Sequence, residues 1–212
     1  AMCKTDSANS KLNDSSSGIA PTTGELLKYA ENLELRSGKT TLKDSGYRKF
    51  QLNELEVIVD VGQIAPSYQP GHSHADSLQL VLNYKNRPVI VDTGISTYEK
   101  NERRQLERST FSHNTVTVNG KNTSHVWGGF RVAKRAKVKI VKESPYEIEA
   151  QHDGYDSEGI FELTKTFKKH PDREFFFSFS HHNHDDYEIE SLFYDTEGTD
   201  ADRDESTIVT NL

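Results

Sequence analysis

The sequence is poor in cysteine, methionine and tryptophan, with one of each in 212 residues. The single cysteine, Cys3, cannot form an internal disulfide, so the fold does not depend on one. No apolar run approaches the ~20 residues of a membrane span, and no signal peptide is recognisable. The net charge of -7 is opposite in sign to the basic surface that nucleic-acid binding requires. These absences predict a protein with neither a membrane span nor a nucleic-acid partner.

Apolar residues are scarce as well. They make up 33% of the chain, and the mean hydropathy is -0.77. A mostly antiparallel sheet can still be built from this supply, because one face can stay wet and only alternate residues need to be apolar. The 10 Phe and 9 Tyr residues provide bulky side chains for its core.

The N-terminal part of the chain differs in composition from the rest. Residues 1–21 are rich in Ser, Asn, Asp and Lys and have almost nothing to bury, so we predict a disordered linker or tail. Its first two residues are typical of a tag remnant, and a signal or a preceding domain could have been removed there. Residues 22–44 are predicted to hold a short helix over 24–33, capped by Thr23, and a connection.

Residues 45–212 are predicted to form one β domain, because apolar and polar residues alternate along them. In the clearest window, 77–84, apolar or aromatic residues occupy every second position. The dipeptides Asn119-Gly120 and Asp153-Gly154 are tight-turn signals between other windows. The predicted strands are 55–61, 77–84, 88–91, 114–118, 130–141, 146–151, 160–167, 174–180 and 187–194. This pattern predicts an all-β fold, a two-sheet antiparallel β-sandwich with a disordered or short-helical N-terminal extension.

Candidate metal ligands lie near predicted strand ends. His72 and His74 stand two residues apart, so in extended backbone both imidazoles face the same side. Asp92 follows an apolar strand, and His113 immediately precedes the strand predicted at 114–118. Two His and one Asp are ligands that zinc accepts, and three protein ligands leave one position open. Such short motifs also occur by chance and in turns, so the spacing alone leaves a metal site and a polar loop as alternatives.

A longer pattern carries a family resemblance. Gly-His-x-His-Ala-Asp at 71–76, Asp-x-Gly at 92–94 with Tyr98 nearby, and Arg-Ser-Thr-x-x-His-Asn-Thr-Val-x-Val-x-Gly at 108–120 occur in this order. Over about residues 45–131 the sequence resembles the heparinase II/III family of polysaccharide lyases, which includes related alginate lyases. In that family an (α/α) toroid precedes a β-sandwich, and the active site lies between the two.

The resemblance implies roles for individual residues. His74, Asp92 and His113 would bind zinc, whereas His72 would face the substrate. Tyr98 matches a family tyrosine near the active site, so His72 and Tyr98 are the catalytic candidates. Members of the family cleave acidic, uronic-acid-containing polysaccharides by β-elimination. In this reaction a base removes the C5 proton and an acid protonates the leaving oxygen.

The part of the family pattern that precedes the β region is missing from this sequence. Residues before position 45 hold one short predicted helix and no toroid. We therefore expect an acidic polysaccharide and the toroid domain of the same parent chain as partners, and no activity from this chain alone. The resemblance also implies a bacterial protein that is periplasmic or secreted.

Three arginines and the tryptophan are further candidates for substrate contact. Arg108 lies inside the matched motif and is predicted to bind a substrate carboxylate, since Arg pairs with carboxylates bidentately. The alternative is an arginine that braces the His113 loop. Arg103 and Arg104 are predicted to lie in an exposed loop closed by internal salt bridges. Trp127 is the candidate for stacking on a sugar ring, although a lone Trp more often belongs to a core.

Two other functions fit parts of the sequence. A non-catalytic carbohydrate-binding β-sandwich would use its metal only to brace loops, but such modules usually present several exposed aromatic residues. A cupin-like metal barrel would share the Pro-Gly-His-Ser-His run at 70–74, but Leu78 stands where a cupin carries Glu. The lyase domain is therefore the main prediction, and the binding module with a structural metal is the alternative.

Overall fold

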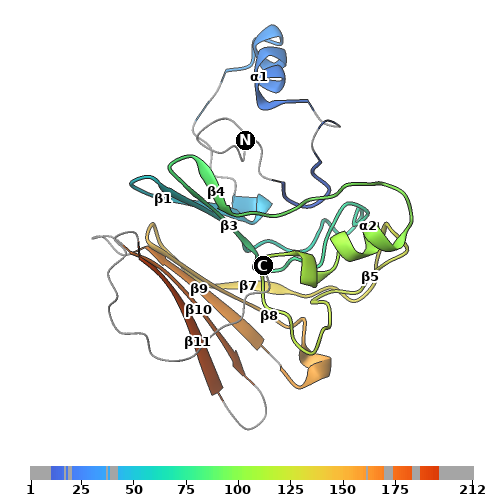
Figure 1. Ribbon diagram of the computed structural model, residues 1–212, viewed down its shortest axis with the longest axis vertical. Helices are drawn as coiled ribbons and strands as arrows, with labels where there is room; N and C mark the ends of the chain where they lie inside the picture. Colours follow the sequence, from blue (N-terminus) through green and yellow to red (C-terminus); the bar gives the residue numbers. More distant parts are fainter. Residues whose placement is uncertain are drawn as a thin grey trace. The chain divides into compact units, whose positions relative to one another are not determined.

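The computed structural model describes residues 11–16, 18, 21–36, 38, 43–160, 162–169, 174–182 and 187–195. Contacts within the chain divide it into two compact units, residues 1–135 and residues 136–212. Each unit is built on an antiparallel sheet (Figure 1). No helix in this described part is long and apolar enough to cross a bilayer.

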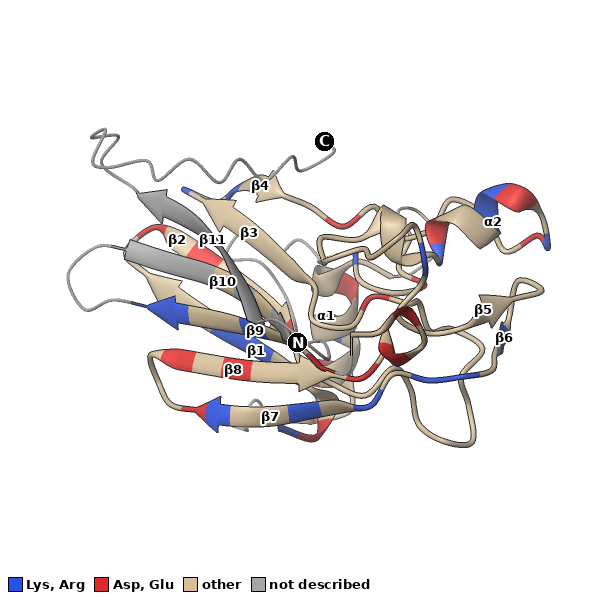
Figure 2. Cartoon of the chain, turned by 90° about the horizontal axis from the view of Figure 1, so that it is seen from below, with Lys and Arg blue, Asp and Glu red and all other residues tan. Residues whose placement is uncertain are grey.

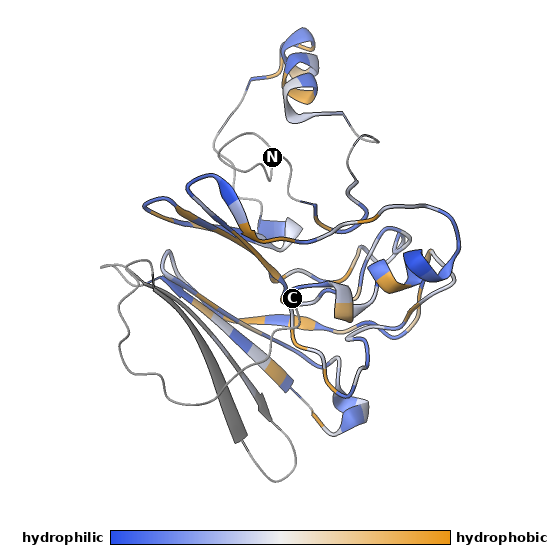
Figure 3. Cartoon of the chain, viewed as in Figure 1, coloured by the Kyte–Doolittle hydropathy of each residue, from blue (hydrophilic) through white to orange (hydrophobic). Residues whose placement is uncertain are grey.

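The first unit holds a four-stranded sheet with the order β1-β2-β3-β4. Its strands are β1 (Tyr47–Leu52), β2 (Leu55–Asp60), β3 (Leu80–Tyr84) and β4 (Arg87–Ile90). The two central strands are almost wholly buried, and this sheet carries much of the hydrophobic colour in Figure 3. Lys85 and Asn86 turn β3 into β4 with φ angles of 49° and 60°. Two successive positive φ angles are the geometry of a tight hairpin turn.

The other elements of the first unit are short. Helix α1 (Thr23–Asn32) begins with a capping box, in which Thr22 and Glu25 each accept a hydrogen bond from the other's backbone amide. Helix α2 (Glu102–Glu107) is capped by Asn101. The unit also contains the 3-10 helices Lys43–Ser45 and Thr110–Ser112 and the paired strands β5 (Val126–Trp127) and β6 (Arg131–Val132).

The second unit is a five-stranded sheet with the order β11-β10-β9-β8-β7. Its elements are β7 (Val138–Glu143), β8 (Glu147–His152), the 3-10 helix Asp156–Glu158, β9 (Glu162–Lys169), β10 (Glu174–His182) and β11 (Tyr187–Asp195). Every second residue of β8 is buried, and Ile148, Leu163 and Phe167 belong to the core. Figure 2 shows charged residues along β7, β8 and β9, which fits a sheet with one wet face.

The predicted all-β, antiparallel class is confirmed, and β1 begins two residues after the predicted start of the β domain. The packing of two sheets into a sandwich stays a prediction. Residues 114–118 were expected to form a strand, and this is wrong. Asn114 instead uses its side-chain amide to bridge the carbonyl oxygens of Leu80 and Val91, at 3.0 and 2.8 Å. The strand expected over 130–141 is two strands, β6 and β7.

Candidate functional site

The loop that carries His72 and His74 lies between β2 and β3 and is anchored by Arg108. The Nε and Nη2 atoms of Arg108 both donate to the carbonyl oxygen of Ser73, at 3.0 and 2.8 Å. The Ala75 amide donates to the Arg108 carbonyl oxygen at 2.9 Å. Arg108 has no exposed surface. The structure therefore places Arg108 in the support of this loop rather than on a surface that would meet a saccharide, in contrast to its predicted contact with substrate.

The structure brings the three predicted metal ligands together. The Nδ1 atom of His74 lies 3.2 Å from the Nε2 atom of His113, and the Nδ1 atom of His113 lies 2.7 Å from Asp92 Oδ2. All three side chains are buried. The other nitrogen of His74, Nε2, lies 2.9 Å from an oxygen of Asp14. The result is a row of four groups, carboxylate, imidazole, imidazole and carboxylate.

The two outer carboxylates fix the protonation of the two rings. An ionised carboxylate only accepts hydrogen bonds, so it requires a proton on the ring nitrogen that faces it. The protons of neutral His74 and His113 are therefore on Nε2 and Nδ1, and the lone pairs of the other two nitrogens face each other across 3.2 Å. Facing lone pairs repel unless a cation lies between them. The geometry therefore calls for a shared proton or a metal ion between the two rings.

The residues fit part of a zinc site. Zn–N bonds of about 2.0–2.1 Å in a tetrahedron place two ligand nitrogens about 3.3 Å apart, close to the 3.2 Å between His74 and His113. Metal-binding histidines usually donate their second N–H to a carboxylate, as both rings do here. Asp92 lies on the outer nitrogen of His113 rather than between the rings. Among the described residues, no three His, Cys, Asp or Glu side chains form a group that could hold a metal ion.

Buried acids favour a positive charge at His113, whereas burial lowers the pKa of its neighbour His74. Burial raises the pKa of Asp76 above its usual range, and burial also raises that of Asp60. Both carboxyls act electrostatically on His113. Burial lowers the pKa of His113, but the bond to Asp92 and the charges of these acids outweigh it, so the pKa is raised. The raised pKa of His113 shows that the surroundings stabilise a cation at this ring.

His72 has a different environment from His74. Its side chain is 62% exposed, and its Nδ1 atom lies 2.7 Å from Asp14 Oδ2. The ring of Tyr98 stands edge-on to the His72 ring, with 6.3 Å between the centroids. The Tyr98 hydroxyl donates to the carbonyl oxygen of Asp14 at 3.1 Å. The two catalytic candidates are therefore neighbours, and Asp14 contacts both of them.

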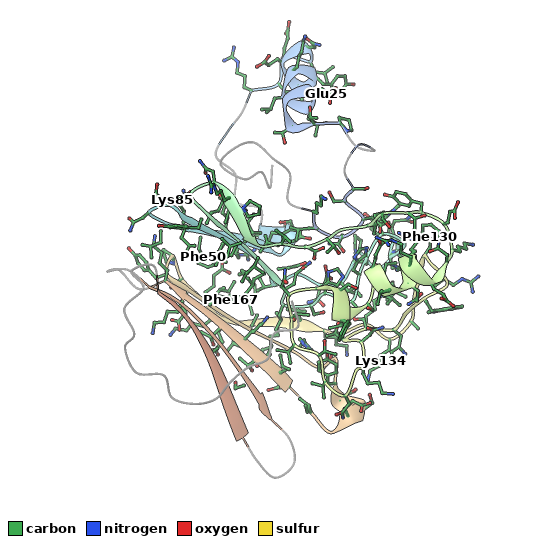
Figure 4. All side chains as sticks on the ribbon, in the orientation of Figure 1. Glu25, Phe50, Lys85, Phe130, Lys134 and Phe167 are labelled. Atoms are coloured by element: carbon green, nitrogen blue, oxygen red, sulfur yellow. The ribbon has the colours of Figure 1, made fainter. Side chains whose placement is uncertain are left out.

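Arg104 is buried, which the sequence did not predict. Its Nη1 and Nη2 atoms bind the two carboxylate oxygens of Asp14 at 3.1 and 2.9 Å, and its Nε atom donates to the Gly129 carbonyl oxygen at 2.7 Å. Its guanidinium also stacks on Phe130, labelled in Figure 4, at 4.3 Å from the ring centroid. Arg103 does lie in an exposed position and pairs with Glu107 at 3.0 Å. Successive helical residues point about 100° apart, so α2 sends these two arginines to different surroundings.

Asp14 and Asn13 are site residues that sequence reasoning missed, because composition assigned residues 1–21 to a linker or tail. Asn13 accepts from the His74 amide at 3.2 Å and donates to the Tyr47 hydroxyl at 2.8 Å. Burial alone would raise the pKa of Asp14, but hydrogen bonds from His74 and Arg104 hold it well below its usual range. The described residues 11–16 lie within the predicted linker or tail and contribute to the site through these contacts, while the division at residue 21 stays a prediction.

Gly94 lies next to the N-terminal segment, and a glycine is the sequence feature that permits such a close approach of two backbone segments. It has a φ of 61°, and a Cβ atom added to it would lie 2.1 Å from the carbonyl oxygen of Ser15. The Ile95 amide donates to that same oxygen at 3.1 Å. The glycine of the Asp-x-Gly motif is thus needed for the close passage of another backbone segment.

Trp127 lies at the edge of the first unit on β5. Its side chain is 48% exposed, and the guanidinium of Arg131 covers its ring at 4.6 Å from the centroid. This exposure is what a sugar-stacking residue needs, and the core alternative does not hold. Its contact with a saccharide stays a prediction.

Comparisons with known proteins agree with this picture. The family model described as "Heparinase II/III-like, C-terminal" matches residues 35–193. The chain is similar to the solved structure of the "Heparinase III-BT4657 gene product", with a TM-score of 0.64 and 15% identity, over 86% of this chain and 31% of that chain. It is also similar to heparan sulfate lyase HepC from Pedobacter heparinus, with a TM-score of 0.57 and 14% identity, over 83% of this chain and 30% of that one. A search of curated proteins found no match.

The chain spans less than a third of the length of these two solved structures. At such low identities the structural likeness shows a shared fold. The family match covers most of the chain and includes every predicted site residue. The chain therefore belongs to the heparinase II/III-like C-terminal domain family.

Proposed function

We propose that the chain is the β domain of a polysaccharide lyase that cleaves uronic-acid-containing polysaccharides by β-elimination. The observation that carries the proposal is that one residue, Asp14, joins the exposed His72 and Tyr98 to the buried His74. Its carboxylate contacts both histidines, and its backbone carbonyl oxygen accepts from the Tyr98 hydroxyl. Similar solved structures are named as a heparinase III and a heparan sulfate lyase. Heparan sulfate is therefore the substrate that we propose to test first.

His72 is proposed to assist proton transfer. Its Nδ1 atom faces Asp14, so Nε2 is the nitrogen left for a substrate, and the side chain is 62% exposed. Tyr98 is proposed to act beside it, because its side chain is partly exposed and its ring stands edge-on to the His72 ring. Imidazole and phenol groups are both used as acids and bases in enzymes. The remaining catalytic groups are proposed to come from an (α/α) toroid domain of a longer parent chain.

His74 and His113 are proposed to bind a zinc ion, with Asp92 as the third predicted ligand. The facing nitrogens at 3.2 Å and the surrounding buried acids support this proposal. In this structure Asp92 holds His113 through Nδ1. When bound, zinc would fix the two rings, brace the loop that carries His72 and supply positive charge near a substrate carboxylate.

Trp127 is proposed to contact a sugar ring through its exposed face. A large acidic polysaccharide is met outside the cytoplasm, so a periplasmic or secreted location is proposed for the parent protein.

The test is to incubate the full-length parent protein with heparan sulfate and, separately, with alginate. We expect growth of the absorbance of unsaturated uronates with at least one of these polymers. The 212-residue chain alone should give no such growth, because the proposed toroid groups are absent from it. No eliminase activity of the parent on any uronic polymer would contradict the proposed function. Robust turnover by the chain alone would show that its own residues supply both the base and the acid.

A further inference from the structure

We propose that Asp14 is a positioning residue for His72, which it holds in the Nδ1–H tautomer so that Nε2 faces outward as a proton acceptor. The proposal rests on the proposed function in one respect, the part that His72 plays in proton transfer. Asp14 belongs to the N-terminal segment of residues 11–16, 58 positions before His72.

Asp14 is held firmly enough to position another group. Its carboxylate receives four contacts from three side chains, one from His72, one from His74 and two from Arg104, at 2.7 to 3.1 Å. Its side chain is 6% exposed, and that of Arg104 is fully buried. The bidentate Arg–carboxylate pair fixes the plane of the carboxylate as well as its place.

The backbone around Asp14 is fixed too. Its carbonyl oxygen accepts from Tyr98, and the next carbonyl oxygen, that of Ser15, accepts from the Ile95 amide. On the other side, Asn13 binds the His74 amide. Three successive residues of the segment are therefore attached to the loops that carry the candidate catalytic residues.

The chemistry of the carboxylate determines the tautomer of His72. Oδ2 of Asp14 accepts hydrogen bonds, so the His72 nitrogen at 2.7 Å from it carries the proton. Neutral imidazole in water prefers the opposite tautomer, with the proton on Nε2. Without Asp14, the outward nitrogen of His72 would therefore be a donor for most of the time, and it would be unable to accept a proton from a substrate.

Arg104 makes this arrangement possible without an excess of negative charge. Its guanidinium makes two hydrogen bonds to Asp14 and supplies the counter-charge of this buried carboxylate. The same carboxylate also orients His74, because its second oxygen lies 2.9 Å from Nε2 of that ring. One acid thus sets the tautomers of an exposed and a buried histidine together.

The direct test is the tautomer of His72 in the 212-residue chain itself. Long-range proton–nitrogen NMR on chelator-treated chain, at a pH above the ordinary His pKa of ~6.5, distinguishes protonated from bare ring nitrogens. We expect a protonated Nδ1 and a bare Nε2 at His72 in the wild type. A protonated Nε2 in the wild type would overturn the proposal, and this result needs no variant.

Variants then test the cause. Asp14→Ala should convert His72 to the Nε2–H tautomer, and Asp14→Asn, which keeps the shape of the side chain, should at least mix the two tautomers. The matched control is Asp44→Ala, at an exposed aspartate of the same unit, which should leave the His72 signals unchanged. An unchanged Nδ1–H tautomer at His72 in a folded Asp14 variant would also overturn the proposal.

Turnover by the parent protein separates positioning from inhibition. Asp14→Asn should lower kcat on the order of 10- to 100-fold, the usual range for a group that orients a functional side chain, with little change in KM. A rise in turnover would show that Asp14 blocks the site, which contradicts the proposal. If the wild-type parent has no lyase activity, the proposed function fails, while the tautomer of His72 still decides the role of Asp14.

Discussion

The free energy of unfolding of the second unit should decrease as the pH is lowered, because of one buried histidine, His152. This side chain is 1% exposed, and its Nδ1 atom accepts from the Gly154 amide at 3.0 Å, so the ring is neutral. Its Nε2 atom is buried and has no hydrogen-bond partner among the residues that the structure describes. Burial, assisted by the charge of Lys165, lowers the pKa of His152 from 6.5 to about 4.

The sign and size of the effect follow from this shift. Because the folded pKa lies below the unfolded one, the contribution of His152 is complete above pH 6.5 and is lost as the pH falls toward 4. Each pH unit is worth up to about 1.4 kcal/mol, so the free energy of unfolding should fall by about 3 kcal/mol across this window from His152 alone.

The assay is urea denaturation followed by circular dichroism at several pH values between 7.5 and 4.5. His152→Gln should be less stable than the wild type at neutral pH but should show a shallower loss of stability on acidification. The matched control is His125→Gln, at an exposed histidine, which should keep the wild-type slope. An identical pH slope for His152→Gln and the wild type would refute the reasoning.

Two further predictions concern the first unit. Arg104→Gln leaves the buried Asp14 carboxylate without its counter-ion and should lower the free energy of unfolding by about 3–5 kcal/mol. The control Arg103→Gln, at the exposed neighbour, should lower it by less than ~1 kcal/mol. Equal losses of the two variants in denaturant melts would contradict the importance of the buried ion pair. Gly94→Ala should expel the N-terminal segment and speed amide exchange at Ile95, because the added Cβ would lie 2.1 Å from Ser15 O. Gly120→Ala has a similar φ of 65° and open space around it, so unchanged exchange at Ile95 is expected there, and equal effects of the two substitutions would contradict the steric explanation.

The sequence could predict the fold class and most of the sheet. Alternation of polar and apolar residues is local, and it marked β2, β4, β8, β9, β10 and β11 close to their observed bounds. The strand predicted from residue 77 begins at residue 80 as β3, and β1 and β7 were not predicted as separate strands. It could not mark the segment 114–118 correctly. Its alternating pattern is that of a strand, but the side chains of Asn114 and Thr115 donate to the carbonyl oxygens of Leu80 and Ser77, and the segment does not form a strand.

The site was predictable where its residues lie within the motifs of the family pattern. His74, Asp92 and His113 were expected together, and the structure places them side by side in one row. Their binding of a metal stays a prediction. Asp14 was not predictable from composition, because a polar segment is held in place only when distant partners supply hydrogen bonds. The burial of Arg104 depends on the same distant carboxylate, so it was missed for the same reason.

The central claim is that His74 and His113 bind the metal while the neighbouring His72 serves the reaction. The most direct measurement is His72→Ala in the full-length parent, with zinc content and turnover determined on the same preparation. We predict full zinc content and turnover lowered on the order of a hundredfold or more, the scale of a lost acid–base group. Loss of zinc together with His72, or turnover at the wild-type level, would contradict the account.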